Sequence, residues 1–147
     1  MVVLQEKFKY STNSQNKLNT CHRDLQVIFQ LVLERRDHTI ICGHRTKEAQ
    51  LGAFNSGASK VTWPNSRHNT IPSMAVDAAP YFPDVKIDWK DEIAFAYFAG
   101  IVMNIAEEAL DLNLVEYKLK WGGDWDMDGR NADQRFNDLV HYELYRV

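Results

Sequence analysis

Apolar residues recur along this chain with two different spacings, and the spacing changes from segment to segment. Over residues 23–35 they fall three or four positions apart and predict an amphipathic helix, with an apolar face of Leu25, Ile28, Phe29, Leu31 and Val32. The polar residues 11–14 before it could cap a short helix. A further helix is expected over residues 47–55, where Thr46 is a suitable N-cap and Gly57 a suitable stop. Residues 91–112 give the strongest helix prediction. They are apolar almost all the way round, so we expect this helix to be central and buried.

Short apolar or alternating runs lie between these segments and predict strands. They cover residues 39–42, 74–78, 117–121 and 141–147. Residues 63–72 are loop by composition, and residues 122–137 form an acidic loop that contains glycine. Helices and strands mix without a regular βαβ rhythm. The pattern therefore predicts an α+β fold with a small, mainly antiparallel sheet flanked by helices.

Composition narrows the class of protein. The 147 residues are 45% hydrophobic and 25% charged, which is typical of one globular domain, and the net charge of −3 argues against a nucleic-acid partner. The N-terminus lacks a signal-peptide pattern, and the longest apolar run, residues 93–103, is too short to span a bilayer. Cys21 and Cys42 form no CxxC pair, so we expect two small buried side chains in a reducing compartment. A chain made and kept in the cytoplasm is expected, unless another factor releases it.

Two separated fragments of the chain could together hold a catalytic zinc. His68, Asp77 and His141 would supply three ligands and leave the fourth tetrahedral position open for water. Asp77 stands between Val76 and Ala78, and a carboxylate in an apolar strand is costly without a partner. Asp138 lies three positions before the second histidine and is free to act as a base. Three further histidines have no comparable acidic pattern and are interpreted as ordinary: His22, His38 and His44.

The acidic loop carries a second candidate metal site. Asp124, Asp126 and Asp128 precede Gly129 in the spacing that opens an EF-hand calcium loop. The glutamate usual at the twelfth position is replaced by Arg135, although Asp133 could substitute at a different spacing. The alternative is a solvated acidic loop beside the active site.

Several motifs in order give the chain a family resemblance over residues 11–144. They are Gly43-His44-Arg45-Thr46, Gln50, residues 57–61, Ser66-Arg67-His68, Ala75-Val76-Asp77, Trp121-Gly122-Gly123-Asp124-Trp125 and residues 138–144. This set resembles the zinc D-Ala-D-Ala peptidase superfamily, which includes the vancomycin-resistance carboxypeptidases. Within it, the order and the tryptophan motif look most like the phage endolysins that are L-alanyl-D-glutamate peptidases.

The resemblance implies a zinc DD-peptidase (hedgehog-like) fold and a role for each matching residue. His68, Asp77 and His141 would bind zinc, Asp138 would act as general base and acid, and Arg45 would steady the substrate carbonyl and the oxyanion. Three residues would contact substrate or shape the cleft: Ser66, Gln50 and Ser59. The segment between His68 and Asp77 is longer than in many relatives and includes Pro72, which suggests a variable loop at the cleft rim.

The same resemblance implies the setting in which the protein works. The partner would be bacterial peptidoglycan, and the whole chain would be one catalytic domain, residues 1–147, without a separate wall-binding domain. The protein would be a monomer without stable membrane insertion, regulated by calcium through the acidic loop. It would stay in the host cytoplasm until a separate membrane pore releases it to cause lysis.

Three other functions stay open at this point. One is a carboxypeptidase that removes terminal D-Ala with the same zinc. Another is a non-catalytic module that binds the wall, against which the presence of Asp138 beside all three ligands argues. The third is an unrelated domain with coincidental histidines. Trp63, Trp121 and Trp125 are expected in the core first, and Trp125, beside the acidic loop, could instead line the peptide cleft. Three cations are expected at the surface: Lys118, Lys120 and Arg130.

Overall fold

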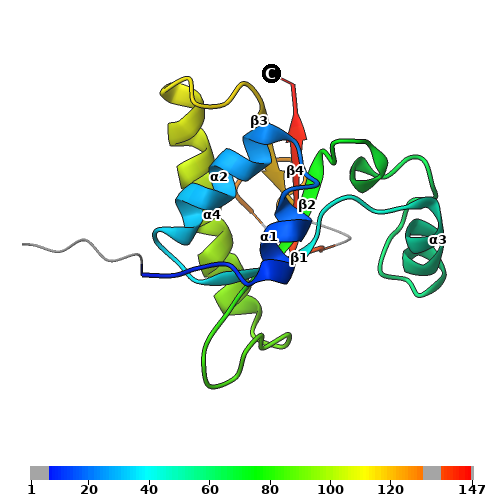
Figure 1. Cartoon of the computed structure of the whole chain (residues 1–147), viewed down its shortest axis with the longest axis horizontal. Helices are drawn as coiled ribbons and strands as arrows, with labels where there is room; N and C mark the ends of the chain where they lie inside the picture. The colour runs from blue at the N-terminus through cyan, green and yellow to red at the C-terminus, as the bar shows by residue number, and fades with distance from the viewer. Residues whose placement is uncertain (1–6, 131–136, 147) are drawn as a thin grey trace, which may run out of the picture.

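The computed structural model describes residues 7–130 and 137–146 (Figure 1). The helices are α1 (Thr12–Leu18), α2 (Arg23–Leu33), α3 (Lys47–Asn55), the short 3₁₀ turn η1 (Arg67–Asn69) and α4 (Glu92–Asp111). The strands are β1 (His38–Cys42), β2 (Ala75–Pro80), β3 (Lys118–Trp121) and β4 (His141–Tyr145). Each predicted helix and strand is present within a few residues of its expected bounds.

The four strands form one antiparallel sheet in the order β1-β2-β4-β3. β2 is buried at every residue, as expected for an interior strand made mainly of small apolar residues. The C-terminal strand β4 pairs with β2 on one side and β3 on the other, and the register sets Asp77 opposite His141. The predicted α+β class with an antiparallel sheet is confirmed.

One hydrophobic core joins the sheet to the helices. α2 packs against α4, and α4 packs against β2 and β3, on one side of the sheet (Figure 1). Phe29, Phe98 and Tyr142 meet in this core, with ring centroids 5.5 Å apart for Phe29 and Tyr142. Burial of such side chains contributes on the order of 2 kcal/mol each.

α4 corrects the expectation of a fully buried helix. Phe95, Phe98 and Val102 face the core, but Ile93 and Tyr97 are 83% and 63% exposed. The elements that pack on α4 contact one face of it, so an apolar residue on the other face stays in water. By length and composition alone, this 20-residue helix could cross a membrane, and 33% of its most apolar 18-residue stretch is buried in the fold. A core helix of a soluble protein meets the same criterion, so the absence of membrane insertion stays a prediction.

α3 begins and ends where its capping residues predict. The Thr46 side chain accepts a hydrogen bond from Ala49 N, and Gly57 adopts a φ of +83°, which suits glycine after a helix. The helix projects from the body of the fold (Figure 1), and Gln50 is its one buried residue. Since apolar packing contributes little here, polar contacts must hold α3 in place.

Candidate metal centre and active-site cleft

The three predicted ligands converge from three elements that are far apart in the sequence. His68 lies in η1, Asp77 in the middle of β2 and His141 at the start of β4. His68 Nε2 is 3.1 Å from Asp77 Oδ1 and 3.2 Å from His141 Nδ1, and His141 Nδ1 is 3.2 Å from Asp77 Oδ1. All three residues are buried. Three donor atoms therefore form a nearly equilateral triangle.

This triangle has the dimensions of a zinc site. Nitrogen and carboxylate ligands lie about 2.0–2.2 Å from zinc, so two ligands of a tetrahedron are about 3.3 Å apart. The observed separations of 3.1–3.2 Å agree with that spacing. Two imidazoles and one carboxylate also match the donor types zinc prefers at catalytic sites. The donor set fits a zinc ion with one open position.

Each imidazole directs its other nitrogen at an acceptor. His68 Nδ1 lies 2.7 Å from the carbonyl oxygen of Gly43, and His141 Nε2 lies 3.0 Å from Glu143 Oε1. Each of these nitrogens therefore donates its hydrogen outward, so the nitrogen inside the triangle is the one that a metal could bind once its proton is displaced. The Glu143 contact was missed from the sequence. The signal for it was the spacing of two, which puts both side chains on one face of β4.

Without a metal, the charges of the triangle compensate one another. Burial by itself would lower the pKa of His68, but the Asp77 carboxylate raises it to about 10. For His141, burial is likewise outweighed by hydrogen bonds to Asp77 and Glu143, which raise its pKa to about 9. Burial would raise the pKa of Asp77, yet the two histidines hold it well below its usual range. A metal ion that binds here would displace protons from both imidazoles.

Arg45 lies at the edge of the triangle. Its Nη2 is 3.4 Å from Asp77 Oδ2, on the oxygen that faces away from the histidines, and its backbone N donates to His68 O at 2.8 Å. Nη1 donates to Gln50 Oε1 at 3.0 Å. The guanidinium is thus oriented on two sides and adds a permanent positive charge beside the candidate metal site.

Gln50 is fully buried and does not line the cavity above the triangle, so its predicted part in the cleft can only be to shape it from behind the surface. Its Nε2 donates to Ser59 Oγ at 2.9 Å and to Val61 O at 2.8 Å, while its Oε1 accepts from Arg45. The side chain acts on the cleft indirectly, because it ties α3 and the following loop to the arginine.

A cavity of about 540 Å³ opens over the triangle. Its walls include Arg45, Ser59, Lys60, Ser66, Arg67, His68, Asp77, Trp125, Asp138, His141 and Glu143. Asp138 is half-buried there, and burial followed by the charge of Asp77 raises its pKa. Ser66 uses its hydroxyl to cap η1, accepting from His68 N at 3.2 Å. The predicted base, the arginine and two of three predicted substrate contacts therefore share one cavity with the triangle.

Comparison with known proteins adds the family. The model of the phage L-alanyl-D-glutamate peptidase family matches residues 6–145. The chain belongs to that family. This peptidase also superimposes on the crystal structure of the Serratia marcescens L-Ala D-Glu endopeptidase ChiX, with a TM-score of 0.69 and 23% identity over 95% of this chain and 92% of that one. The two chains therefore share one fold.

A second solved structure is more distant. The vancomycin-resistance D,D-dipeptidase VanXYg aligns with a TM-score of 0.45 and 17% identity, over 94% of this chain and 51% of that chain. No curated protein sequence matches this one.

The loop between His68 and Asp77 does not form the cleft rim of the peptidase, contrary to expectation. Residues 69–76 contribute nothing to the cavity wall. Ser73 is instead buried against the α1–α2 connection, where its N donates to Thr20 O and its O accepts from His22 N. The extra residues therefore join η1 to the body of the fold.

The three tryptophans of the peptidase have different environments. Trp125 lines the cavity with its ring 5.5 Å from that of His141, whereas Trp121 packs against the core and donates from Nε1 to Leu139 O. Trp63 is 43% exposed, with the ammonium of Lys47 5.2 Å from its ring. The expectation of a core position first holds for Trp121 alone.

The acidic loop gathers three carboxylates near the surface. Oxygens of Asp124, Asp126 and Asp128 lie within 4.8 Å of one another, and Gly129 N donates to Asp124 Oδ2 at 2.8 Å. Gly129 has a φ of +78°, as the glycine of a calcium loop requires. Asp133 and Arg135 lie outside the described residues. Exposed acidic groups also cluster without an ion, so this geometry alone supports no regulation by calcium.

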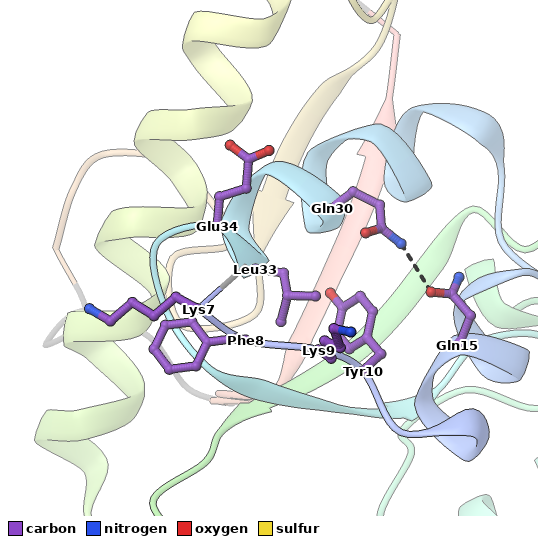
Figure 2. A pocket seen from close by; sticks show the side chains of 8 residues that line it. All are labelled: Lys7, Phe8, Lys9, Tyr10, Gln15, Gln30, Leu33 and Glu34. Carbon is purple, nitrogen blue, oxygen red and sulfur yellow. Dashed lines mark hydrogen bonds between the residues drawn. The ribbon is translucent and has the colours of Figure 1, made fainter. Parts of the chain in front are cut away.

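A second hollow of about 350 Å³ lies between the N-terminal segment and α2 (Figure 2). Lys7, Phe8, Tyr10 and Leu33 line it, and Gln30 donates across it to Gln15 at 3.1 Å. It shares no residue with the cavity over the triangle. The groups suited to peptide hydrolysis are gathered in the larger cavity.

Proposed function

We propose that this peptidase binds one zinc ion through His68, Asp77 and His141 and hydrolyses the L-Ala-D-Glu bond of peptidoglycan stem peptides. The observation that carries the proposal is the triangle of donor atoms, 3.1–3.2 Å on each side, in which each imidazole directs its other nitrogen at an acceptor outside the triangle. Its position in the wall of the 540 Å³ cavity gives a peptide access to the fourth coordination position.

When bound, zinc would lower the pKa of a water molecule and polarise the scissile carbonyl. Asp138, in the same cavity wall, would accept one proton from the attacking water as the new C–O bond forms. It would pass that proton to the D-Glu nitrogen as the C–N bond breaks, which leaves an amine and a carboxylic acid, and the acid's remaining proton then moves to the amine to give an ammonium and a carboxylate. Arg45 would stabilise negative charge on the carbonyl oxygen. Ser59 and Ser66 would offer hydrogen bonds to the substrate backbone.

A synthetic stem peptide with both an L-Ala-D-Glu bond and a terminal D-Ala-D-Ala tests the specificity. Mass spectrometry should detect free L-Ala and a new peptide that begins with D-Glu, and both products should disappear with a chelator. Release of D-Ala instead would show a carboxypeptidase. Intact peptide, with zinc demonstrably bound, would contradict catalysis and favour a wall-binding module.

We extend the proposal to lysis of a bacterial host. The support is membership in a phage peptidase family, together with a cavity suited to a wall peptide. The enzyme would remain in the cytoplasm until a separate membrane pore opens a path to the wall. Added enzyme should then lower the turbidity of cells whose outer barrier has been permeabilised, and an Asp138→Asn variant should not.

Calcium binding at Asp124, Asp126 and Asp128 is a separate proposal. It is supported by the converging oxygens and by the positive φ of Gly129. Titration calorimetry with calcium should give heat that an Asp126→Asn/Asp128→Asn double variant loses. A flat titration together with activity independent of calcium would refute it.

A further inference from the structure

We propose that Glu143 is a positioning residue for the metal centre, and that Arg67 holds Glu143 in place. Glu143 would keep the His141 ring oriented with Nδ1 toward the metal. This inference rests on the proposed function, because it takes the triangle of His68, Asp77 and His141 to be the zinc site.

The contact of Glu143 with His141 follows from the strand. The two residues are two positions apart on β4, so their side chains lie on the same face of the sheet. His141 Nε2 donates to Glu143 Oε1 at 3.0 Å, and the side chains are only 9% and 19% exposed. Water therefore competes weakly for this hydrogen bond, which fixes both the tautomer and the rotation of the ring.

The two candidate histidine ligands are oriented by different kinds of acceptor. His68 is oriented by a backbone carbonyl, that of Gly43, which the fold itself supplies. His141 is oriented by a carboxylate side chain. A carboxylate acceptor makes the imidazole a stronger donor to the metal than a neutral carbonyl does. Of these two hydrogen bonds, only the one between His141 and Glu143 can be removed by substituting the acceptor's side chain.

Arg67 joins the two parts of the metal centre. It precedes His68 in η1, yet its Nε lies 3.6 Å from Glu143 Oε2 and its Nη2 donates to the carbonyl of Leu144. Lys120 lies opposite Glu143 in the β3–β4 register and adds a second positive charge near the carboxylate. The turn that carries one histidine is therefore braced against the strand that carries the other. This bracing limits the directions that Glu143 can take.

Zinc affinity tests the role of Glu143 without relying on catalysis. Competition with a chromogenic chelator should show that Glu143→Ala binds zinc about 10–100-fold more weakly than the wild type. Glu143→Gln should recover most of the affinity, because its amide oxygen can still accept from Nε2–H. The control is Glu108→Ala, an exposed residue of α4, which should bind zinc as the wild type does.

Proton NMR of the zinc-loaded protein gives a second result. The wild type should show a slowly exchanging Nε2–H resonance of His141, and Glu143→Ala should lose it. If Glu143→Ala fails to fold, as judged by circular dichroism, Glu143→Met keeps the volume and replaces it. Zinc affinity within twofold of wild type in the Ala or Met variant would overturn the proposal.

The role of Arg67 is tested by combining substitutions. Arg67→Ala should weaken zinc binding less than Glu143→Ala does, and the double variant should bind no more weakly than Glu143→Ala alone. Fully additive losses would overturn the link through Arg67. A wild-type protein that binds no zinc at all would instead refute the proposed function, so the two failures are distinguishable.

Discussion

Replacement of Gln50 by methionine tests whether polar contacts hold the projecting helix α3 and, through it, Arg45, the residue proposed to stabilise the oxyanion. Methionine has nearly the same volume but cannot form the four hydrogen bonds of the amide. Oε1 accepts from Arg45 and Asn69, and Nε2 donates to Ser59 and Val61. The substitution therefore removes polar contacts with little change in packing.

The expected magnitude follows from the number and burial of these bonds. A hydrogen bond contributes a net of about 1 kcal/mol, and a buried group left without a partner costs about 1–3 kcal/mol. Because α3 is largely exposed apart from Gln50, water can reach some of the released groups. We therefore expect the free energy of local opening to fall by about 3 kcal/mol, and amide exchange in residues 47–61 to rise by about 10²-fold. The catalytic constant should fall by about tenfold as Arg45 loosens.

Hydrogen–deuterium exchange with mass spectrometry measures this opening segment by segment. Gln30→Met is the matched control, because Gln30 is an exposed helical glutamine whose side chain bonds only Gln15 among the hydrogen bonds described (Figure 2). It should change exchange nowhere by more than a few fold. Unchanged exchange of residues 47–61 in Gln50→Met would refute the reasoning.

Three other predictions concern the metal centre and the core. Asp138→Asn should keep the fold and the zinc but lower the rate by about 10²–10⁴-fold, measured on the synthetic stem peptide; a near-normal rate would remove Asp138 from the mechanism. His68→Ala should contain no zinc by elemental analysis, and chelator treatment of the wild type should abolish turnover until zinc is restored. Burial lowers the pKa of His38 to about 4, so on acidification the His38 imidazole becomes protonated in the unfolded chain before it does in the folded protein. The contribution of neutral His38 to the free energy of unfolding is complete above about pH 6.5 and is lost as the pH falls toward 4, about 3 kcal/mol in all. Urea unfolding at several pH values should show this loss in the wild type, and His38→Gln should reduce the dependence of the unfolding free energy on pH.

Local chemistry explains which elements could be predicted from the sequence. The bounds of α3 followed from Thr46 and Gly57, because capping depends on neighbouring residues only. The candidate metal triad could be predicted because Asp77 stands in an apolar strand, where a carboxylate needs partners. The sequence pattern did not predict that β4 lies between β2 and β3, since strand order depends on contacts between distant segments.

The errors have the same physical origin. The apolar pattern of α4 showed how much of the helix could be buried but not which face other elements would cover. Glu143 was missed because its role needs both the face of β4 and Arg67, a residue from a different element. For Gln50 the sequence left open whether the side chain contacts substrate or shapes the cleft, because that choice depends on burial that only the fold determines.

We propose that one zinc ion, held by His68, Asp77 and His141, is required for cleavage of L-Ala-D-Glu bonds in the bacterial wall. Mass spectrometry of purified peptidoglycan digested with the zinc-loaded enzyme, beside a chelator-treated sample, tests it most directly. We predict new free amino groups on D-glutamate with zinc and none with chelator. Equal cleavage in both samples, or release of D-Ala without new D-glutamate amines, would contradict the account.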